Sequence, residues 1–501
     1  MILPLTIPPK GLAMFKKIPV AILFMVSCCA LAQTQFSDDT RKYISVDSPV
    51  VALTHVRIID GTGAAPAEDQ TILIANGRIQ KIGKSADITV PPGARVLEKR
   101  GYTVIPGLVG MHNHLYYTAS LNRDEHGGTP APGYFVNMVP YTGPRLYLAC
   151  GVTSMRTAGS LEPYTDINVK KNIDTGRMPG PKTYLTAPYL EGPPGGSLIP
   201  QMHDLTGPDD ARTMVKFWAD TGFTSFKAYM HITRAELKAA TEEAHKRGLK
   251  VTAHLCSVGY REAAELGVDN LEHGFYVDSE FATSKQPDIC PSQRDISDAL
   301  LKLEPTSDAA QATFRTLIEH HVALTSTLPV FEAGTGIRPP LQQRLIDAMS
   351  PESRLSYLAV RARSQTSPNT QRSEAMLKKA MQLEVAFAKA GGTLLAGPDP
   401  TGNGGVLPGF GDQREVELLV EEGFTPMEAI KIATYNGAQF LGVLDQTGTV
   451  AEGKQADLVL IFGDPSKNIN DIEKIETVFK DGVGFDSVAL LESVRGMVGI
   501  R

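Results

Sequence analysis

The pattern of apolar and polar positions divides the chain into a β-rich part, a long part in which strands alternate with helices, and a second β-rich part. Short apolar runs such as residues 51–59 and 71–74 are separated by turn residues, which is typical of a small β domain. The carboxyl end returns to this pattern at residues 456–461 and 476–482. We expect the two ends to build one small β-sandwich domain together.

The middle of the chain has the pattern of a parallel α/β protein. Met376, Ala380, Leu383 and Phe387 repeat at the spacing of one buried helical stripe. This alternation predicts an α/β fold with a (β/α)8 barrel of the TIM type. Eight candidate strands lie near residues 104–109, 153–156, 182–186, 225–229, 250–254, 270–273, 322–326 and 393–396.

Length and composition fit this organisation. The chain has 501 residues, of which 42% are hydrophobic and 21% charged, enough for one large core and a smaller module. Its net charge of -6 offers no basic field for a polyanion, so we expect no nucleic-acid partner. The expected parts are a signal peptide (1–32), a flexible segment (33–47), the first part of the β domain (48–103), the barrel (104–440), and the second part of the β domain with a tail (441–501).

The first 32 residues have the features of a secretory leader. An apolar stretch at 18–31 follows Lys16 and Lys17 and ends in small residues at Ala32. Its fourteen or so residues are fewer than the roughly 20 that span a bilayer, so we expect cleavage and export to the periplasm or the medium rather than a stable membrane span. Lipid anchoring through Cys28 or Cys29 is the alternative. The other three cysteines, Cys256 among them, are too few for a disulfide framework, and Cys256 is expected to be a small buried side chain.

Six polar side chains stand at or just beyond the ends of the apolar runs. They are His112, His114, Lys227, His254, His273 and Asp399. Side chains alternate along a strand, so His112 and His114 face the same side and can bind one ion together. In a parallel barrel the carboxyl ends of all strands meet at one face, which would bring the six side chains together. The sequence therefore predicts a metal centre at that face.

These donors suit two divalent ions. The two histidines of the first strand and Asp399 would hold one ion, because strands one and eight adjoin in a closed barrel, while His254 and His273 would hold the second. An ammonium repels cations, so we expect Lys227 to be carboxylated, since a carbamate offers two oxygens that can bridge two ions. Imidazole and carboxylate ligands suit Zn²⁺ best, although Mn²⁺, Co²⁺ or Fe²⁺ could use the same donors.

The chemistry expected of this centre is hydrolysis of an amide-like bond. Metal binding lowers the pKa of water, so a hydroxide that bridges two ions is a strong nucleophile near neutral pH. Asp399 would orient this water, accept its proton and return the proton to the leaving nitrogen, while the ions polarise the scissile carbonyl.

Four short motifs carry a resemblance to a known family. They are His-Asn-His at 112–114, Gly-Val-Thr-Ser-Met-Arg at 151–156, Glu-His-Gly at 272–274 and the stretch at 423–438. From about residue 51 to residue 481 the chain resembles the amidohydrolase superfamily, in the branch of imidazolonepropionase-like proteins and prolidase-like peptidases. The resemblance implies a metal-dependent hydrolase with these six ligands and Asp399 as acid and base. Gly110 and Thr157 depart from the family, which often has aspartates there.

Three further residues are candidates for substrate contacts. Tyr229 and His231 share a face with Lys227 if that strand continues, where they would meet a substrate carboxylate or an oxyanion. Arg156 ends the second strand and would pair with a substrate carboxylate, or equally serve as a structural ion-pair partner. Lys227 itself has the alternative of a surface lysine with a buried stem. The irregular segment at 279–306 suits a lid or substrate loop.

We therefore expect an exported, metal-dependent enzyme that hydrolyses the amide or peptide bond of a small substrate, namely a dipeptide, an Xaa-Pro dipeptide or an N-acyl amino acid. A cyclic-amide hydrolase of the hydantoinase or imidazolonepropionase type is the alternative. A metal-binding protein without catalysis is an alternative of a different class. The resemblance also implies a homo-oligomer.

Overall fold

The computed structural model describes residues 35–120, 134–192, 199, 201–335, 338–401 and 405–499. The chain beyond residue 35 forms one unit. The expected signal peptide at residues 1–32 lies outside the described residues. Within the described ranges, no helix is long and apolar enough to cross a lipid bilayer.

Eight parallel strands at the centre fall into two ladders. The first has the order β11-β10-β7 and the second β12-β13-β14-β15-β16. These strands are almost entirely buried, as expected where helices cover a parallel sheet. Their bounds are β7 (Leu108–Asn113), β10 (Val152–Thr157), β11 (Lys182–Tyr184), β12 (Ser225–Ala228), β13 (Lys250–Ala253), β14 (Asn270–Glu272), β15 (Ala323–Ser326) and β16 (Leu394–Ala396).

Isolated backbone hydrogen bonds link the two ladders. The amide of Ala187 donates to the carbonyl of Ser225 at 2.9 Å, beyond the end of β11. At the other junction the amide of Asp399 donates to the carbonyl of His112 at 3.1 Å. Pro398 and Pro400 lack an N–H group, so the ladder cannot continue past β16. The fold is TIM-barrel-like, although the strand pairing does not run continuously round a closed barrel.

Seven of the eight predicted strand positions contain one of these strands, and the first is shifted. Residues 104–106 belong to β6 (Tyr102–Pro106), which pairs with β17 (Leu458–Phe462) outside the two ladders, and the first central strand starts only at Leu108. The apolar run is continuous through both strands, so hydrophobicity alone did not separate them.

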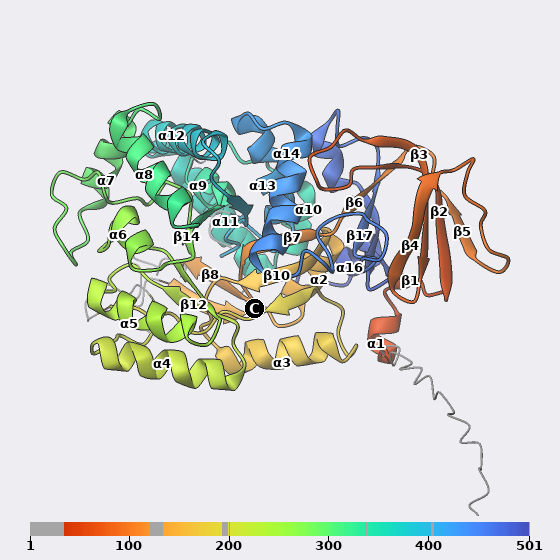
Figure 1. The fold of residues 1–501 in the computed structure, drawn as a ribbon, viewed down its shortest axis with the longest axis horizontal. Helices are drawn as coiled ribbons and strands as arrows, with labels where there is room; N and C mark the ends of the chain where they lie inside the picture. The colour runs from red at the N-terminus through yellow and green to blue at the C-terminus, as the bar shows by residue number, and fades with distance from the viewer. Residues whose placement is uncertain are drawn as a thin grey trace, which may run out of the picture. The chain divides into compact units, whose positions relative to one another are not determined.

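Helices and short strands surround the central strands. The predicted stripe of α12 is confirmed, since Met376, Ala380, Leu383 and Phe387 are all buried. In Figure 1 helices α3, α4 and α5 run along one side of β10 and β12. The bounds are α2 (Thr142–Ala149), α3 (Pro163–Asp174), α4 (Pro208–Thr221), α5 (Arg234–His245), α6 (Tyr260–Glu265), α7 (Gln293–Lys302), α8 (Asp308–Glu319), α9 (Leu328–Ala333), α10 (Gln343–Ala348), α11 (Pro351–Thr366), α12 (Thr370–Lys389), α13 (Phe410–Glu422), α14 (Pro426–Lys431), α15 (Gly437–Phe440), α16 (Ser487–Glu492), the π-helix η2 (Ile432–Asn436), the 3-10 helix η3 (Ile469–Glu473), and the antiparallel pair β8 (Tyr116–Ser120) and β9 (Tyr134–Met138).

The two ends of the chain share one mixed, nine-stranded sheet. Its main path is β1-β19-β18-β17-β6-β2-β3-β4, with β5 paired to β2. Both ends therefore contribute strands, but the pairing shows one sheet and not the two facing sheets of a sandwich. The remaining strands of this sheet are β1 (Ile44–Val46), β2 (Val50–Ile58), β3 (Ala67–Ala75), β4 (Arg78–Lys84), β5 (Arg95–Glu98), β18 (Ile475–Lys480) and β19 (Val483–Asp486).

Part of the segment that was expected to be flexible, residues 33–47, is regular structure. Helix α1 (Asp38–Arg41) starts at the Ser37 cap, and β1 pairs with β19. Phe36 packs edge to face against Phe485, with ring centroids 6.1 Å apart. The few apolar residues in this polar stretch have partners more than 400 positions away, which the local sequence does not reveal.

Candidate metal centre

The six predicted ligands lie around one cavity of about 190 Å³. The structure thus brings together side chains that are spread over almost 290 positions of the chain. Tyrosines and methionines form much of the remaining wall. The predicted ligands in the lining are His112, His114, Lys227, His254, His273 and Asp399, and the other described lining residues are Tyr116, Thr118, Tyr189, Ile199, Met202, Tyr229, Met230 and Thr401.

Asp399 lies among the histidines. Its Oδ1 is 3.0 Å from Nε2 of His114 and 3.5 Å from Nε2 of His112, and its Oδ2 is 4.0 Å from Nδ1 of His273. Ligand atoms of His112, His273 and Asp399 all lie within 4.8 Å of one another, close enough to bind one ion. Burial alone would raise the pKa of Asp399, but its electrostatic and hydrogen-bond interactions with His112 and His114 hold it well below its usual value.

Three of the site histidines, His114, His254 and His273, are held in the neutral form that binds metals. Burial lowers the pKa of His114 to about 4 and that of His254 to about 3. The rings of His254 and His273 have centroids 4.3 Å apart, and those of His112 and His273 lie 4.7 Å apart. Burial also holds the pKa of His273 well below its usual value, so these three imidazoles can bind ions without first losing a proton near neutral pH.

Lys227 is buried, with a side chain only 1% exposed, so the alternative of a surface lysine is wrong. Its Nζ lies 3.6 Å from Oε1 of Glu272 and has no hydrogen-bond partner among the described residues. Burial lowers the pKa of Lys227 to about 8. A neutral amine is the form that reacts with carbon dioxide, so this environment fits carboxylation.

Two of the ligands have left-handed backbone conformations. The φ angle is 70° at His273 and 53° at Asp399. Such angles cost energy for residues other than glycine, and they persist where the surrounding structure enforces them. At Asp399 the flanking prolines and the bond to the His112 carbonyl provide that constraint.

Sequence reasoning missed the role of Glu272. Its side chain is fully buried, and its Oε2 lies 2.8 Å from Nδ1 of His112. Strand alternation would place Glu272 and His273 on opposite sides of β14, but the positive φ at His273 breaks the alternation, so His273 lines the cavity while Glu272 reaches the ring of His112. The Glu-His-Gly motif was the available signal.

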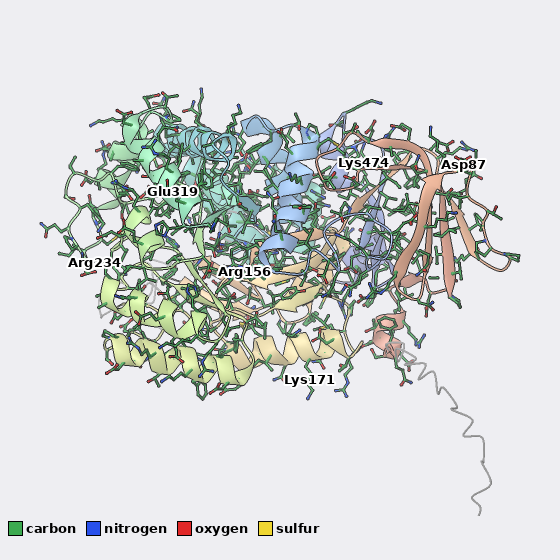
Figure 2. The ribbon with its side chains drawn as sticks, in the orientation of Figure 1. Asp87, Arg156, Lys171, Arg234, Glu319 and Lys474 are labelled. Carbon is green, nitrogen blue, oxygen red and sulfur yellow. A yellow bond between two sulfur atoms is a disulfide. The ribbon has the colours of Figure 1, made fainter. Side chains whose placement is uncertain are left out.

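Arg156 occupies the position of an ion-pair partner. Its Nη2 donates to Oε1 of Glu272 at 2.7 Å and its Nε donates to the carbonyl of Met111 at 2.8 Å. Only 1% of the side chain is exposed and it does not line the cavity, which leaves no contact with a substrate there. In Figure 2 Arg156 lies in the interior among the strands.

Of the two other candidates for substrate contacts, Tyr229 is in the cavity lining and His231 is not. Tyr229 lines the cavity, with its ring 4.9 Å from that of Tyr189 and 5.1 Å from that of His254. His231 does not line it, because β12 ends at Ala228 and the chain turns, so the alternation assumed for His231 fails. Its amide instead donates to Oε1 of Glu191 at 2.8 Å.

Gly110 and Thr157, the two residues that depart from the family pattern, each contact a neighbouring polar group. A Cβ atom on Gly110 would lie 2.7 Å from Oδ1 of Asp412, and that oxygen accepts a 2.9 Å hydrogen bond from Nδ2 of Asn113. The Asp412 carboxylate from α13 thus occupies the space beside Gly110 and holds the residue between the two strand-one histidines. Thr157 accepts a 2.8 Å hydrogen bond from the amide of Thr186.

Cys256 is buried, as expected, but it also forms a disulfide with Cys290, with Cα atoms 4.9 Å apart, which the sequence did not predict. The segment at 279–306, which was expected to be irregular, contains a helix. Residues 293–302 form α7, and Oγ of Ser279 donates to the carbonyl of Cys256 at 2.6 Å. Thirty-four positions separate the cysteines, so only the return of this loop to the end of β13 brings them together.

Known proteins resemble this chain over most of its length. A dihydroorotase from Pelotomaculum thermopropionicum is 23% identical over 430 residues, which cover 81% of this chain and 88% of that protein. The structure of a Xaa-Pro dipeptidase with bound methionine matches at a TM-score of 0.63 and 20% identity, covering 87% of this chain and 100% of that one. The structure of A. niger ochratoxinase matches at a TM-score of 0.62 and 20% identity, covering 88% and 96%.

The sequence pattern of the Amidohydrolase family matches residues 103–484, more than half of the chain. This family is generally metal-dependent, and the His and Asp donors of the cavity are of the kind that bind such ions. The match confirms the resemblance that the motifs indicated. The chain belongs to the amidohydrolase family and is a hydrolase of carbon–nitrogen bonds.

Proposed function

We propose that the protein hydrolyses the amide or peptide bond of a small substrate, namely an Xaa-Pro or other dipeptide or an N-acyl amino acid. The observation that carries this proposal is the ring of six donors around one cavity, with Asp399 3.0 Å from His114. The similarity to a Xaa-Pro dipeptidase structure supports the peptide-like substrate. The proposal takes the eight central strands to act as one closed barrel.

The donor set fits two divalent ions, which we take to be Zn²⁺. The two strand-one histidines and Asp399 would hold one ion, His254 and His273 the other, and carboxylated Lys227 would bridge them. When bound, such ions activate water and polarise a carbonyl group. The unpartnered Nζ of Lys227 and the neutral histidines support this fit.

The protein supplies proton transfer and binding. Asp399 is positioned to accept the proton of the attacking water and to deliver it to the leaving nitrogen, because its carboxylate stays ionised among the histidines. Tyr229 lines the cavity, and its hydroxyl would donate a hydrogen bond to a substrate carboxylate or to the developing oxyanion.

A cyclic-amide hydrolase is the second candidate. The similarity to dihydroorotases, over 430 residues in one case, favours it. Zn²⁺-loaded protein should be assayed against Xaa-Pro dipeptides, N-acyl amino acids and cyclic amides, with Asp399→Asn as the control. Turnover of the linear amides supports our first choice. Cleavage of rings alone would reverse the order, and no turnover of any of these substrates would refute both.

We further propose that the protein is exported to the periplasm or secreted, and that it forms a homo-oligomer. The Cys256–Cys290 bond supports export, because disulfides persist in oxidising compartments. Mass spectrometry of the mature amino terminus tests this. A terminus after Ala32 supports soluble export, a lipid on Cys28 or Cys29 indicates anchoring, and an uncleaved leader contradicts both. Light scattering tests the oligomeric state, and a monomer would contradict the second proposal.

A further inference from the structure

We propose that Glu272 is a positioning residue which, held by Arg156, fixes the ring of His112 and thereby sets the affinity of the centre for its metal ions. This inference rests on the proposed function in so far as His112 is taken to bind an ion. It assigns a role to two residues that touch neither the cavity nor a substrate.

Glu272, at the end of β14, contacts three other central strands. It accepts from His112 on β7 at 2.8 Å through Oε2 and from Arg156 on β10 at 2.7 Å through Oε1, and Oε1 also lies 3.6 Å from Nζ of Lys227 on β12. None of its side chain is exposed. A carboxylate that faces a guanidinium remains ionised and therefore only accepts hydrogen bonds.

This contact determines which nitrogen His112 presents to the cavity. Because Glu272 can only accept, Nδ1 of His112 must carry the hydrogen, which leaves the lone pair on Nε2. That nitrogen points toward Asp399, whose Oδ1 lies 3.5 Å away. A carboxylate on the far nitrogen of a ligating imidazole both fixes the ring and makes it a better donor.

Arg156 holds the same histidine from its backbone side. Its Nε donates to the carbonyl of Met111, the residue before His112, at 2.8 Å, while its Nη2 holds the carboxylate of Glu272. One guanidinium thus positions both the backbone that leads into His112 and the acceptor beyond its ring. Figure 2 shows Arg156 deep in the interior, where no solvent competes for these bonds.

Among the described residues, His114 and His273 have no carboxylate hydrogen-bonded behind the ring as His112 has. Nδ1 of His273 is 2.9 Å from the neutral hydroxyl of Thr327, and Nδ1 of His114 has no hydrogen-bond partner among the described residues. A buried ion pair contributes little net stability by itself, so stability alone gives no reason for burying this one. The Glu272–Arg156 pair lies at the Nδ1 side of His112, and holding that ring in place gives a reason for burying the pair.

The test is the Zn²⁺ affinity of purified Glu272→Gln protein, measured by competition with a chromophoric chelator. Glutamine keeps the shape of the side chain but removes the charge. We expect affinity for one ion to fall about 10- to 100-fold, the usual cost of losing such a partner. The matched control is Asp457→Asn, which removes another fully buried carboxylate, paired with Lys182 at 2.8 Å and absent from the cavity lining. It should bind Zn²⁺ like the wild type.

A second variant keeps the test decisive if Glu272→Gln does not fold, as judged by thermal melting. Arg156→Lys keeps the charge, but an ammonium cannot donate to the Met111 carbonyl and the Glu272 carboxylate in the geometry of the guanidinium. We therefore expect a smaller loss of Zn²⁺ affinity. Wild-type affinity in a folded variant of either kind would overturn the inference and leave the proposed function untouched. A wild-type protein that binds no divalent ion would instead refute the proposed function.

Discussion

Gly397, directly after β16, lies against the backbone of His112 on β7, and Gly397→Ala tests this close approach. A Cβ atom there would lie 2.2 Å from the backbone nitrogen and 2.6 Å from Cβ of His112. Ordinary contact begins at 3.4 Å, so β7 and β16 would have to separate by about 1.2 Å. Backbone atoms cannot rotate away, unlike the end of a flexible side chain.

The expected cost follows from these distances. Overpacking a core typically costs about 1–3 kcal/mol, and stretching the 3.1 Å bond between Asp399 and His112 removes about 1 kcal/mol more. A total near 3 kcal/mol lowers the melting temperature of a unit of this length by about 3 °C. The separation also moves His112 away from Asp399, and a misplacement of about 1 Å can cost roughly 100-fold in rate.

Thermal melting, Zn²⁺ content and kcat/KM of Gly397→Ala measure these effects. Gly259→Ala is the matched control, because its φ of -76° suits alanine and its Cβ would meet Glu280 at an ordinary 3.5 Å. If Gly397→Ala melted within about 1 °C of the wild type and kept its Zn²⁺ and its rate, the close approach of these strands would not hold the metal centre together, and our reasoning would be wrong.

Four further results are expected. Asp399→Asn should lower kcat by about 10²- to 10⁴-fold in a folded, Zn²⁺-loaded protein, the usual share of proton transfer; a full rate would refute its role. Dialysis against a chelator should abolish activity and Zn²⁺ should restore it, whereas activity in metal-free protein would contradict a metal-dependent reaction. Cys290→Ser should destabilise the fold by up to about 4 kcal/mol through the freed loop between Cys256 and Cys290, and unfolding in denaturant that matches the wild type would show that the disulfide does not form. Burial raises the pKa of Asp166 from 3.8 to about 7, so the folded state keeps a proton that the unfolded state releases, and stability falls as pH rises from about 4 to 7. Asp166→Asn should therefore raise the melting temperature at pH 8 but not at pH 4, and equal shifts at both would contradict this pKa.

The sequence by itself determined the order of the strands and the six candidate donors. Apolar runs that end in His, Lys or Asp mark the carboxyl ends of parallel strands, and a parallel α/β arrangement gathers those ends at one face. For this reason the six donors could be named before any contact was known. The first strand was misplaced because one apolar run continues through β6 into β7.

Only the tertiary structure decided what surrounds those donors. Glu272 meets His112 across 160 positions, and Asp412 meets Asn113 across 299, so no local pattern predicts either contact. His231 leaves the site because β12 ends three residues before it, and the alternation rule holds only while a strand continues. Periodicity along the chain fixes which way a side chain points within one strand, but the partner that it meets depends on how separate strands pack.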